Sequence, residues 1–224
     1  IPTIVKGFPF FITFQTYFNK ETLFSILLNM NKILILFAHP AFHKSRIHKI
    51  LAEMAQSFGG VTFHNLYDRY PDYFIPVKQE QQLIQEQDIL IWQHPFYWYS
   101  CPSLMKEWID LVLEHNFAYG RKGTSLHGKK ALSVISTGGN EAVYTRREKE
   151  HYSIKQFLSP FHQTARLCGM EYLPPFVVFG SHLLTDDQIS AYARDYERLL
   201  TALREGTLPT IRWEDGETIN PWTH

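Results

Sequence analysis

Four consecutive aromatic residues, Phe96–Tyr99, are the side chains whose type and position best suit ligand chemistry. They follow the unbroken apolar run Ile89–Trp92, which predicts a strand buried on both faces of a parallel sheet. Pro95 predicts the end of that strand, and Pro102 predicts the start of a helix. Flat rings at the carboxyl end of a parallel strand suit a flat ligand. Core packing is the alternative for any single ring, but four in a row cannot all point inward.

A second candidate site is the loop His39–His48, which follows the apolar run Ile33–Ala38. Apolar residues at helical spacing predict a helix that begins at about Ser45. A helix start offers unpaired N–H groups and the positive end of the helix dipole, so it can bind an anion. A plain N-cap serine is the alternative. Pro40 disfavours helical presentation of two histidines to a metal, so no metal site is expected.

The third candidate is Ser136-Thr137-Gly138-Gly139, which follows the apolar run Lys130–Ser136. Adjacent glycines allow the backbone to approach a planar ligand and to direct N–H groups at developing negative charge. Taken alone, the same residues are also typical of a simple glycine turn at the end of a strand.

Five apolar segments predict strands, and the helical patterns between and after them predict helices that alternate with those strands. This alternation is typical of an α/β fold with a doubly wound five-stranded parallel sheet, strand order 2-1-3-4-5, and helices on both faces. Residues 66–76 are predicted to be a long loop, and a helix over 154–170 is interrupted near Pro160. The predicted strands lie at 33–38, 61–65, 89–92, 130–136 and 172–179, the last one bent at Pro174-Pro175.

The composition excludes several classes of protein. Lys plus Arg and Asp plus Glu each number 22, so no net charge favours nucleic acid or an anionic membrane surface. The sequence lacks the P-loop and GxGxxG patterns, which disfavours an NTPase or a Rossmann dinucleotide site. Cys101 and Cys168 have no disulfide or zinc spacing, which fits a reducing cytoplasm.

We expect three regions along the 224 residues. Residues 1–29 are aromatic-rich but are broken by Lys20 and Glu21 before reaching the length of a membrane span, so they are expected to be an N-terminal extension outside the domain. Residues 30–204 are expected to form the domain. Residues 205–224 show no periodicity and are expected to be a mobile C-terminal tail.

The aromatic loop and the helix after it contain a characteristic spacing of Pro95, Trp98, Pro102, Lys106, Trp108 and Asp110. This spacing resembles the signature of the flavin-dependent NAD(P)H:quinone oxidoreductases. It is similar to an HP-x-x-WYS-x-P-x-x-x-K-x-WID pattern in the bacterial ancillary proteins of glutathione-regulated potassium efflux systems. The resemblance implies a flavodoxin-like homodimer in which the aromatic loop lies along the edge of the flavin.

The same resemblance implies site residues in all three loops. Tyr144 and His151 match a Tyr and a His that face the flavin and the substrate, although His151 lies one residue later than the usual spacing. A solvated histidine is the alternative for His151. The implied flavin-binding residues are His39, Ser45, Arg46, Ile47, His48, Pro95, Phe96, Tyr97, Trp98, Tyr99, Ser136, Thr137, Gly138 and Gly139.

Two functions follow from the resemblance. One is an NAD(P)H dehydrogenase that transfers hydride from NAD(P)H through FMN to a quinone in ping-pong turnover, with FAD as the alternative cofactor. The short segment after the last helix favours FMN, because longer FAD-binding relatives have an extra C-terminal region. The other is a regulatory subunit of a membrane potassium efflux transporter, held at the inner membrane through that partner. The neutral net charge disfavours an electron-carrying flavodoxin.

Overall fold

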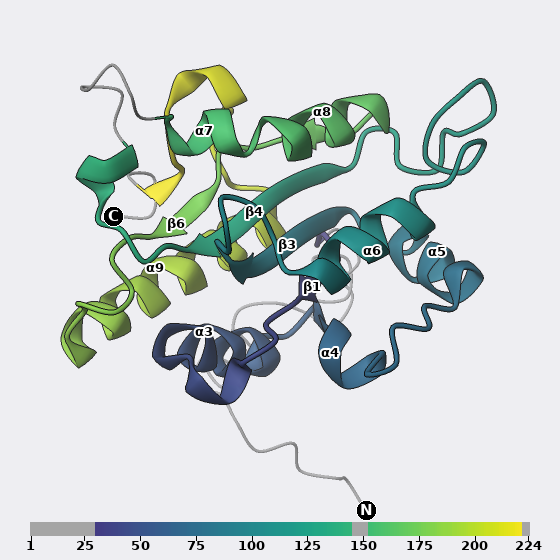
Figure 1. Ribbon diagram of the computed structural model, residues 1–224. Helices are drawn as coiled ribbons and strands as arrows, with labels where there is room; N and C mark the ends of the chain where they lie inside the picture. Colours follow the sequence, from purple (N-terminus) through teal and green to yellow (C-terminus); the bar gives the residue numbers. More distant parts are fainter. Residues whose placement is uncertain (1–29, 145–151, 221–224) are drawn as a thin grey trace, which may run out of the picture. The chain divides into compact units, whose positions relative to one another are not determined.

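A parallel β-sheet lies at the centre of this computed structural model, which describes residues 30–144 and 152–220 (Figure 1). The strand order is β2-β1-β3-β4-β5, with β6 also paired to β4, so the predicted order 2-1-3-4-5 and the flavodoxin-like fold are confirmed. The strands are β1 (Ile33–Phe37), β2 (Val61–Asn65), β3 (Ile89–Pro95), β4 (Lys130–Ser136), β5 (Glu171–Tyr172) and β6 (Phe176–Val178).

The fifth position of the sheet is divided into two short strands, where a single bent strand was predicted. Ala131 pairs with Tyr172 and Val134 pairs with Phe176. Residues 172–176 therefore contain one residue more than the segment of β4 that they lie beside, residues 131–134. Pro174-Pro175 lies in the gap. Proline has no N–H to donate to the ladder, which explains the interruption.

Helices cover both faces of the sheet. The helices α3 and α9 pack on the face that carries Ile33, Ile35 and Phe37, and the other long helices pack on the face that carries Leu34 and Leu36. Every residue of β1 is buried because both faces are covered. The helices are α3 (Arg46–Ser57), α4 (Leu66–Arg69), α5 (Val77–Gln85), α6 (Ser103–Val112), α7 (Ile154–Phe157), α8 (Ser159–Leu167) and α9 (Asp186–Glu205), with 3-10 turns η1 (Phe42–Lys44), η2 (Glu141–Tyr144) and η3 (Trp213–Asp215).

Local capping sets several helix ends. Ser45 caps α3, and Thr185 forms a capping box with Gln188 at the start of α9. The predicted helix over 154–170 is two helices, because α7 ends before Leu158 and α8 then begins with Pro160 in its first turn. Proline is tolerated in a first turn, where its missing N–H would have no partner.

Two predicted boundaries are wrong. Residues 66–76, predicted to be a loop, contain α4. Strand β3 runs through Pro95 instead of ending before it. On one side of β3, the neighbouring strand β1 ends at Phe37, opposite Gln93, so Pro95 needs no N–H for a hydrogen bond to β1. On the other side, toward β4, the hydrogen bond is donated by Phe96 N to Ser136 O at 2.9 Å.

The prediction of a mobile C-terminal tail is also wrong for residues 206–220. Ile211 and Ile219 are buried in the same core as α9. The side chain of Asn220 bonds both the N–H and the C=O of Val177 at 2.9 Å, which satisfies the polar groups of β6. The buried isoleucines and the hydrogen bonds of Asn220 to β6 hold this segment in place. Neither kind of contact requires a periodic sequence, so the lack of periodicity did not indicate a mobile segment.

The contacts of the chain divide it into residues 1–30 and 31–224, and all the elements above belong to the second unit. The extension predicted at 1–29 lies outside the described residues, as does the end of the tail at 221–224. Within the described ranges, no helix is both long enough and apolar enough to cross a membrane.

Candidate functional site

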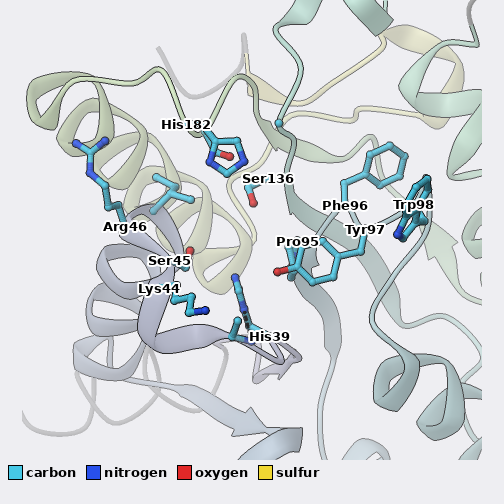
Figure 2. Close-up of a pocket in the computed structure, with 14 residues that line it drawn as sticks. His39, Lys44, Ser45, Arg46, Pro95, Phe96, Tyr97, Trp98, Ser136 and His182 are labelled. Carbon is cyan, nitrogen blue, oxygen red and sulfur yellow. Dashed lines mark hydrogen bonds between the residues drawn. The ribbon is translucent and has the colours of Figure 1, made fainter.

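A cavity of about 630 Å³ opens at the carboxyl edge of the sheet, a size typical of small-molecule sites. Figure 2 shows His39, Lys44 and Ser45 on one side and Phe96–Trp98 on the other, with Ser136 between them and His182 above Ser45. The three loops predicted from the strand order therefore meet, and the loop after β6 joins them. The lining residues are His39, Ala41, Lys44, Ser45, Arg46, Ile47, Pro95, Phe96, Tyr97, Trp98, Ser136, Gly138, Ser181 and His182.

The start of α3 forms one wall of the cavity. Ser45 Oγ accepts a hydrogen bond from His48 N at 3.1 Å, so its own O–H can still donate. The backbone of Arg46 and Ile47 lies in the first turn, where N–H groups have no intrahelical partner. This wall can therefore bind an anion through the positive end of the helix.

His39 adds a neutral donor beside that wall. Burial lowers the pKa of His39 to about 4, so the ring carries one proton at neutral pH. His39 Nδ1 accepts from Ala41 N at 3.1 Å, so the proton must be on Nε2. Because His39 lines the cavity, its Nε2–H is available to a ligand acceptor.

The charge of the cavity is positive. Lys44 and Arg46 line it, and none of its described lining residues is acidic. The Arg46 guanidinium is partly engaged outside the cavity, because it donates to Leu184 O at 2.9 Å and to Asp186 Oδ1 at 2.6 Å. Arg46 thus ties α3 to the start of α9, while Lys44 is exposed at the cavity rim. The lining favours an anionic ligand.

The aromatic loop forms the opposite wall. Phe96 is buried, but Tyr97, Trp98 and Tyr99 are 41%, 92% and 57% exposed, so the four rings do not all point inward. Trp98 and Tyr99 have φ angles of 48° and 63°, a conformation that costs side-chain-bearing residues about 1–2 kcal/mol each. Such strain persists where the surrounding structure imposes it, and it turns Trp98 outward beside the cavity.

A second layer of rings supports this wall. Tyr99 stacks on Phe157 of α7, with centroids 4.8 Å apart, and Phe96 packs edge-on against the same ring at 5.6 Å. Tyr144 contacts Phe96 at 6.0 Å and Phe179 at 6.0 Å. These contacts join the aromatic loop to α7 and to the turn after β4.

The glycine turn after β4 completes the cavity. Gly138 lines it, whereas Thr137 is buried and its hydroxyl donates to Gly139 O at 2.8 Å. A Cβ at Gly139 would lie 3.2 Å from the Tyr144 ring, so a side chain at this position would require that ring to shift by a few tenths of an ångström. Burial raises the pKa of Tyr144 above its ordinary value, which keeps its hydroxyl protonated at neutral pH.

The structure separates the residues singled out from the sequence into those that line the cavity and those that do not. The candidates that do not line the cavity are His48, Tyr99, Thr137, Gly139 and Tyr144. The remaining cofactor-site candidates line the cavity itself. His151 lies outside the described residues, so its role stays a prediction.

Sequence reasoning missed part of the lining. Ala41 and Lys44 lie in the loop already expected to bind, and their proximity to Ser45 could have indicated them. Ser181 and His182 follow Gly180 after β6, whose φ is 62°. Their signal is weaker, because the loop after a fifth strand reaches the cavity only if that strand lies directly beside β4.

Comparisons with known proteins agree with this geometry. The profile of a family described as having a flavodoxin-like fold matches residues 31–200. The glutathione-regulated potassium-efflux system ancillary protein KefG of Pectobacterium atrosepticum is 43% identical over 171 residues, which cover 76% of this chain and 93% of the relative.

Two solved structures are also similar. The general stress protein 14 of Treponema denticola, solved in complex with FMN, has a TM-score of 0.73 and 39% identity, covering 77% of this chain and 99% of that one. An NADPH-quinone reductase of P. pentosaceus has a TM-score of 0.69 and 31% identity, covering 75% and 97%.

The parallel sheet, the cavity at its carboxyl edge and the profile match define a protein of the flavodoxin-like class. Within that class, the chain belongs to the family of NAD(P)H:quinone oxidoreductases and KefG ancillary proteins.

Proposed function

We propose that the protein is an FMN-dependent NAD(P)H:quinone oxidoreductase. The observation that carries this proposal is the cavity itself, which combines a helix start and cationic residues on one wall with an exposed aromatic ring on the other. An anionic, planar ligand matches both walls. The family membership and the FMN complex of the Treponema denticola protein support the same cofactor.

The residues present fit FMN. The phosphate would lie at the start of α3, held by the Ser45 hydroxyl, the N–H groups of Arg46 and Ile47, and the Lys44 ammonium. Tyr97 and Trp98 would lie against the ring system, with Gly138 offering backbone at its other side. Bound FMN supplies hydride chemistry, because it takes two electrons from NAD(P)H and passes them to a quinone. FAD is the alternative cofactor.

One cavity supports ping-pong turnover. Trp98 is exposed at the mouth of the cavity, where NAD(P)H and quinone would both have to enter. Two substrates that use one slot must alternate, so initial rates at several quinone concentrations are expected to give parallel double-reciprocal lines. Intersecting lines would contradict this part of the proposal.

Tyr144 and His151 are proposed as the catalytic residues. The protonated hydroxyl of Tyr144 is suited to donate a hydrogen bond as negative charge develops beside it. The ordinary pKa of a histidine near 6.5 suits His151 to supply a proton at neutral pH. Both roles remain proposals that rest on the family resemblance.

A regulatory role is the second candidate, and the 43% identity to KefG favours it. In this role the protein is a cytoplasmic homodimer that docks on a membrane potassium efflux transporter, with reductase activity secondary. Potassium efflux from cells that carry such a transporter is expected to depend on the protein. Efflux that is the same with and without it would contradict the regulatory role.

The direct test is a titration of the purified protein with FMN and riboflavin, followed by flavin fluorescence. FMN should bind about 10- to 100-fold more tightly than riboflavin, because riboflavin lacks the phosphate and its charge-assisted hydrogen bonds. Anaerobic NADPH should then bleach the bound flavin, and a quinone should restore its absorption. The absence of FMN binding would overturn the proposed function.

A further inference from the structure

His48 is connected to the cavity through Ser136. It is fully buried and does not line the cavity, yet its Nε2 lies 2.9 Å from Oγ of Ser136, which does. His48 is in the first turn of α3 and Ser136 is the last residue of β4, 88 positions away. This contact therefore joins the cavity wall formed by the start of α3 to the turn after β4.

The His48 ring is held in place from several sides. Its backbone N donates to Ser45 Oγ at 3.1 Å. Its ring meets His39 edge-on at 5.2 Å and lies 5.8 Å from the ring of Phe37. A side chain fixed by packing and capping can present Nε2 in one direction without reorganisation.

The position of the His48 proton follows from burial. Burial and the neighbouring His39 and His94 hold the pKa of His48 well below its ordinary value, so the ring carries one proton. Nδ1 is buried and has no hydrogen-bond partner among the described residues. A proton on Nδ1 would leave a buried donor unpaired, which native proteins rarely tolerate. The proton is therefore on Nε2, which donates to Ser136 Oγ.

We propose that His48 is a positioning residue that orients the Ser136 hydroxyl as a hydrogen-bond donor to the flavin in the cavity. Ser136 Oγ uses a lone pair to accept from His48, so its own O–H is free to donate to another acceptor, and Ser136 lines the cavity. This inference rests on the proposed function and deepens it, because it assigns His48 a role through Ser136.

The test compares Ser136→Ala, His48→Leu and the double variant in FMN affinity, in the absorption spectrum of bound FMN and in flavin midpoint potential. Each single variant should weaken FMN binding about 2- to 10-fold, as expected for one lost hydrogen bond, and should shift the spectrum alike. The double variant should be no weaker than Ser136→Ala, because the two residues act as one unit. His48→Gln retains an N–H donor and should stay within about 2-fold of the wild type.

Ser133→Ala is the matched control. Ser133 is buried on the same strand and also bonds an aromatic partner, Tyr172 OH at 2.6 Å, but it does not line the cavity. This control should leave FMN affinity and the spectrum unchanged. If His48→Leu does not fold, Ser136→Ala and His48→Gln decide the question.

Wild-type affinity and spectrum in Ser136→Ala would overturn the inference, as would effects of His48→Leu and Ser136→Ala that multiply in the double variant. Either result leaves the proposed function intact, provided that the wild type binds FMN. A wild type that does not bind FMN would overturn both.

Discussion

Trp98 shows how one residue type can carry two different roles in this chain. It is 92% exposed at a strained φ of 48°, whereas Trp108 on α6 is fully buried and donates from Nε1 to Glu80. Both tryptophans belong to the segment that resembles the quinone oxidoreductases. The structure separates them into a cavity wall and a core anchor.

Trp98→Ala should therefore weaken FMN binding about 2- to 10-fold and lower kcat/KM, because it removes an aromatic face worth about 0.5–1.5 kcal/mol. The free energy of unfolding without flavin should change by less than about 0.5 kcal/mol, since the side chain is exposed. Trp108→Ala is the matched control and should cost about 3–5 kcal/mol. Measurement combines urea unfolding with a flavin titration. A core-sized loss of stability in Trp98→Ala would place Trp98 in the core instead.

Glu80 is a buried charge that the proposed chemistry does not use. It accepts hydrogen bonds from Tyr70 OH and Trp108 Nε1, and its Oε1 lies 3.1 Å from His64 Nε2. Burial raises the pKa of Glu80, but the neighbouring His64, Tyr70 and Trp108 lower it by more, so the net shift is downward and the carboxylate stays ionised. The network links β2, α5 and α6, and both oxygens of the Glu80 carboxylate take part in it.

Glu80→Gln is expected to lower the free energy of unfolding by about 2–4 kcal/mol, because the amide would present an NH₂ group to donors in a buried site. Glu53→Gln on the exposed side of α3 should change it by less than about 0.5 kcal/mol. Urea titrations monitored by far-UV circular dichroism measure both. Equal stability of the two variants would show that the network contributes little.

At the scale of elements, the segment after α9 packs against α7, α8 and β5. Trp213 lies 4.8 Å from the ring of His162 and 5.1 Å from the ring of Tyr172. Lys155 of α7 donates to Trp213 O and lies 4.9 Å from the centre of its ring. Helix α7 also carries Phe157, on which Tyr99 stacks. The C-terminal segment thus supports the helix that backs the aromatic loop.

Deletion of residues 209–224 should lower the free energy of unfolding by about 3–6 kcal/mol, since it removes two buried isoleucines, Ile211 and Ile219. Glu217→Ala in the same segment is exposed and should be nearly neutral. Differential scanning calorimetry of the two proteins tests this. A deletion variant with the wild-type Tm would mean that the segment packs without stabilising the fold.

The whole molecule has an acid-sensitive interior because three histidines are buried near one another. Burial lowers the pKa of His39 and of His94 to about 4, and it lowers that of His48 as well. In the unfolded chain these groups bind protons below about pH 6.5, whereas in the folded protein His39 and His94 stay neutral until about pH 4 and the lowered pKa of His48 keeps it neutral well below pH 6.5. Stability is therefore lost as the pH falls through this window.

The free energy of unfolding should fall between pH 6.5 and 4.5 by up to about 1.4 kcal/mol per pH unit for each histidine. His94→Phe, whose ring can keep the stack on Phe161, should reduce that slope by about one histidine. Glu80 does not confuse the measurement, because its lowered pKa moves its contribution below about pH 4.5. Urea unfolding at pH 7.5, 6.5, 5.5 and 4.5 gives the slope. A stability that is flat with pH would contradict the burial of neutral histidines.

The sequence by itself determined most of the elements and the order of the strands in the sheet. Apolar runs located the strands, Pro174-Pro175 predicted a bend at the point where the structure has a break, and Ser45 marked the start of α3. It also indicated the loops after the first, third and fourth strands as those that meet. These features are readable because side-chain period, proline chemistry and helix capping act within a few neighbouring residues.

The tertiary structure decided which side chains of those loops face the cavity. Arg46 turns to Asp186, 140 positions away, and His48 turns inward to Ser136. His182 lines the cavity from a loop that the sequence did not indicate. Ile219 is buried in the core, although it lies in a segment that was predicted to be mobile. Each outcome depends on which elements pack side by side, and residues so far apart in the chain leave no local pattern that reports their contact.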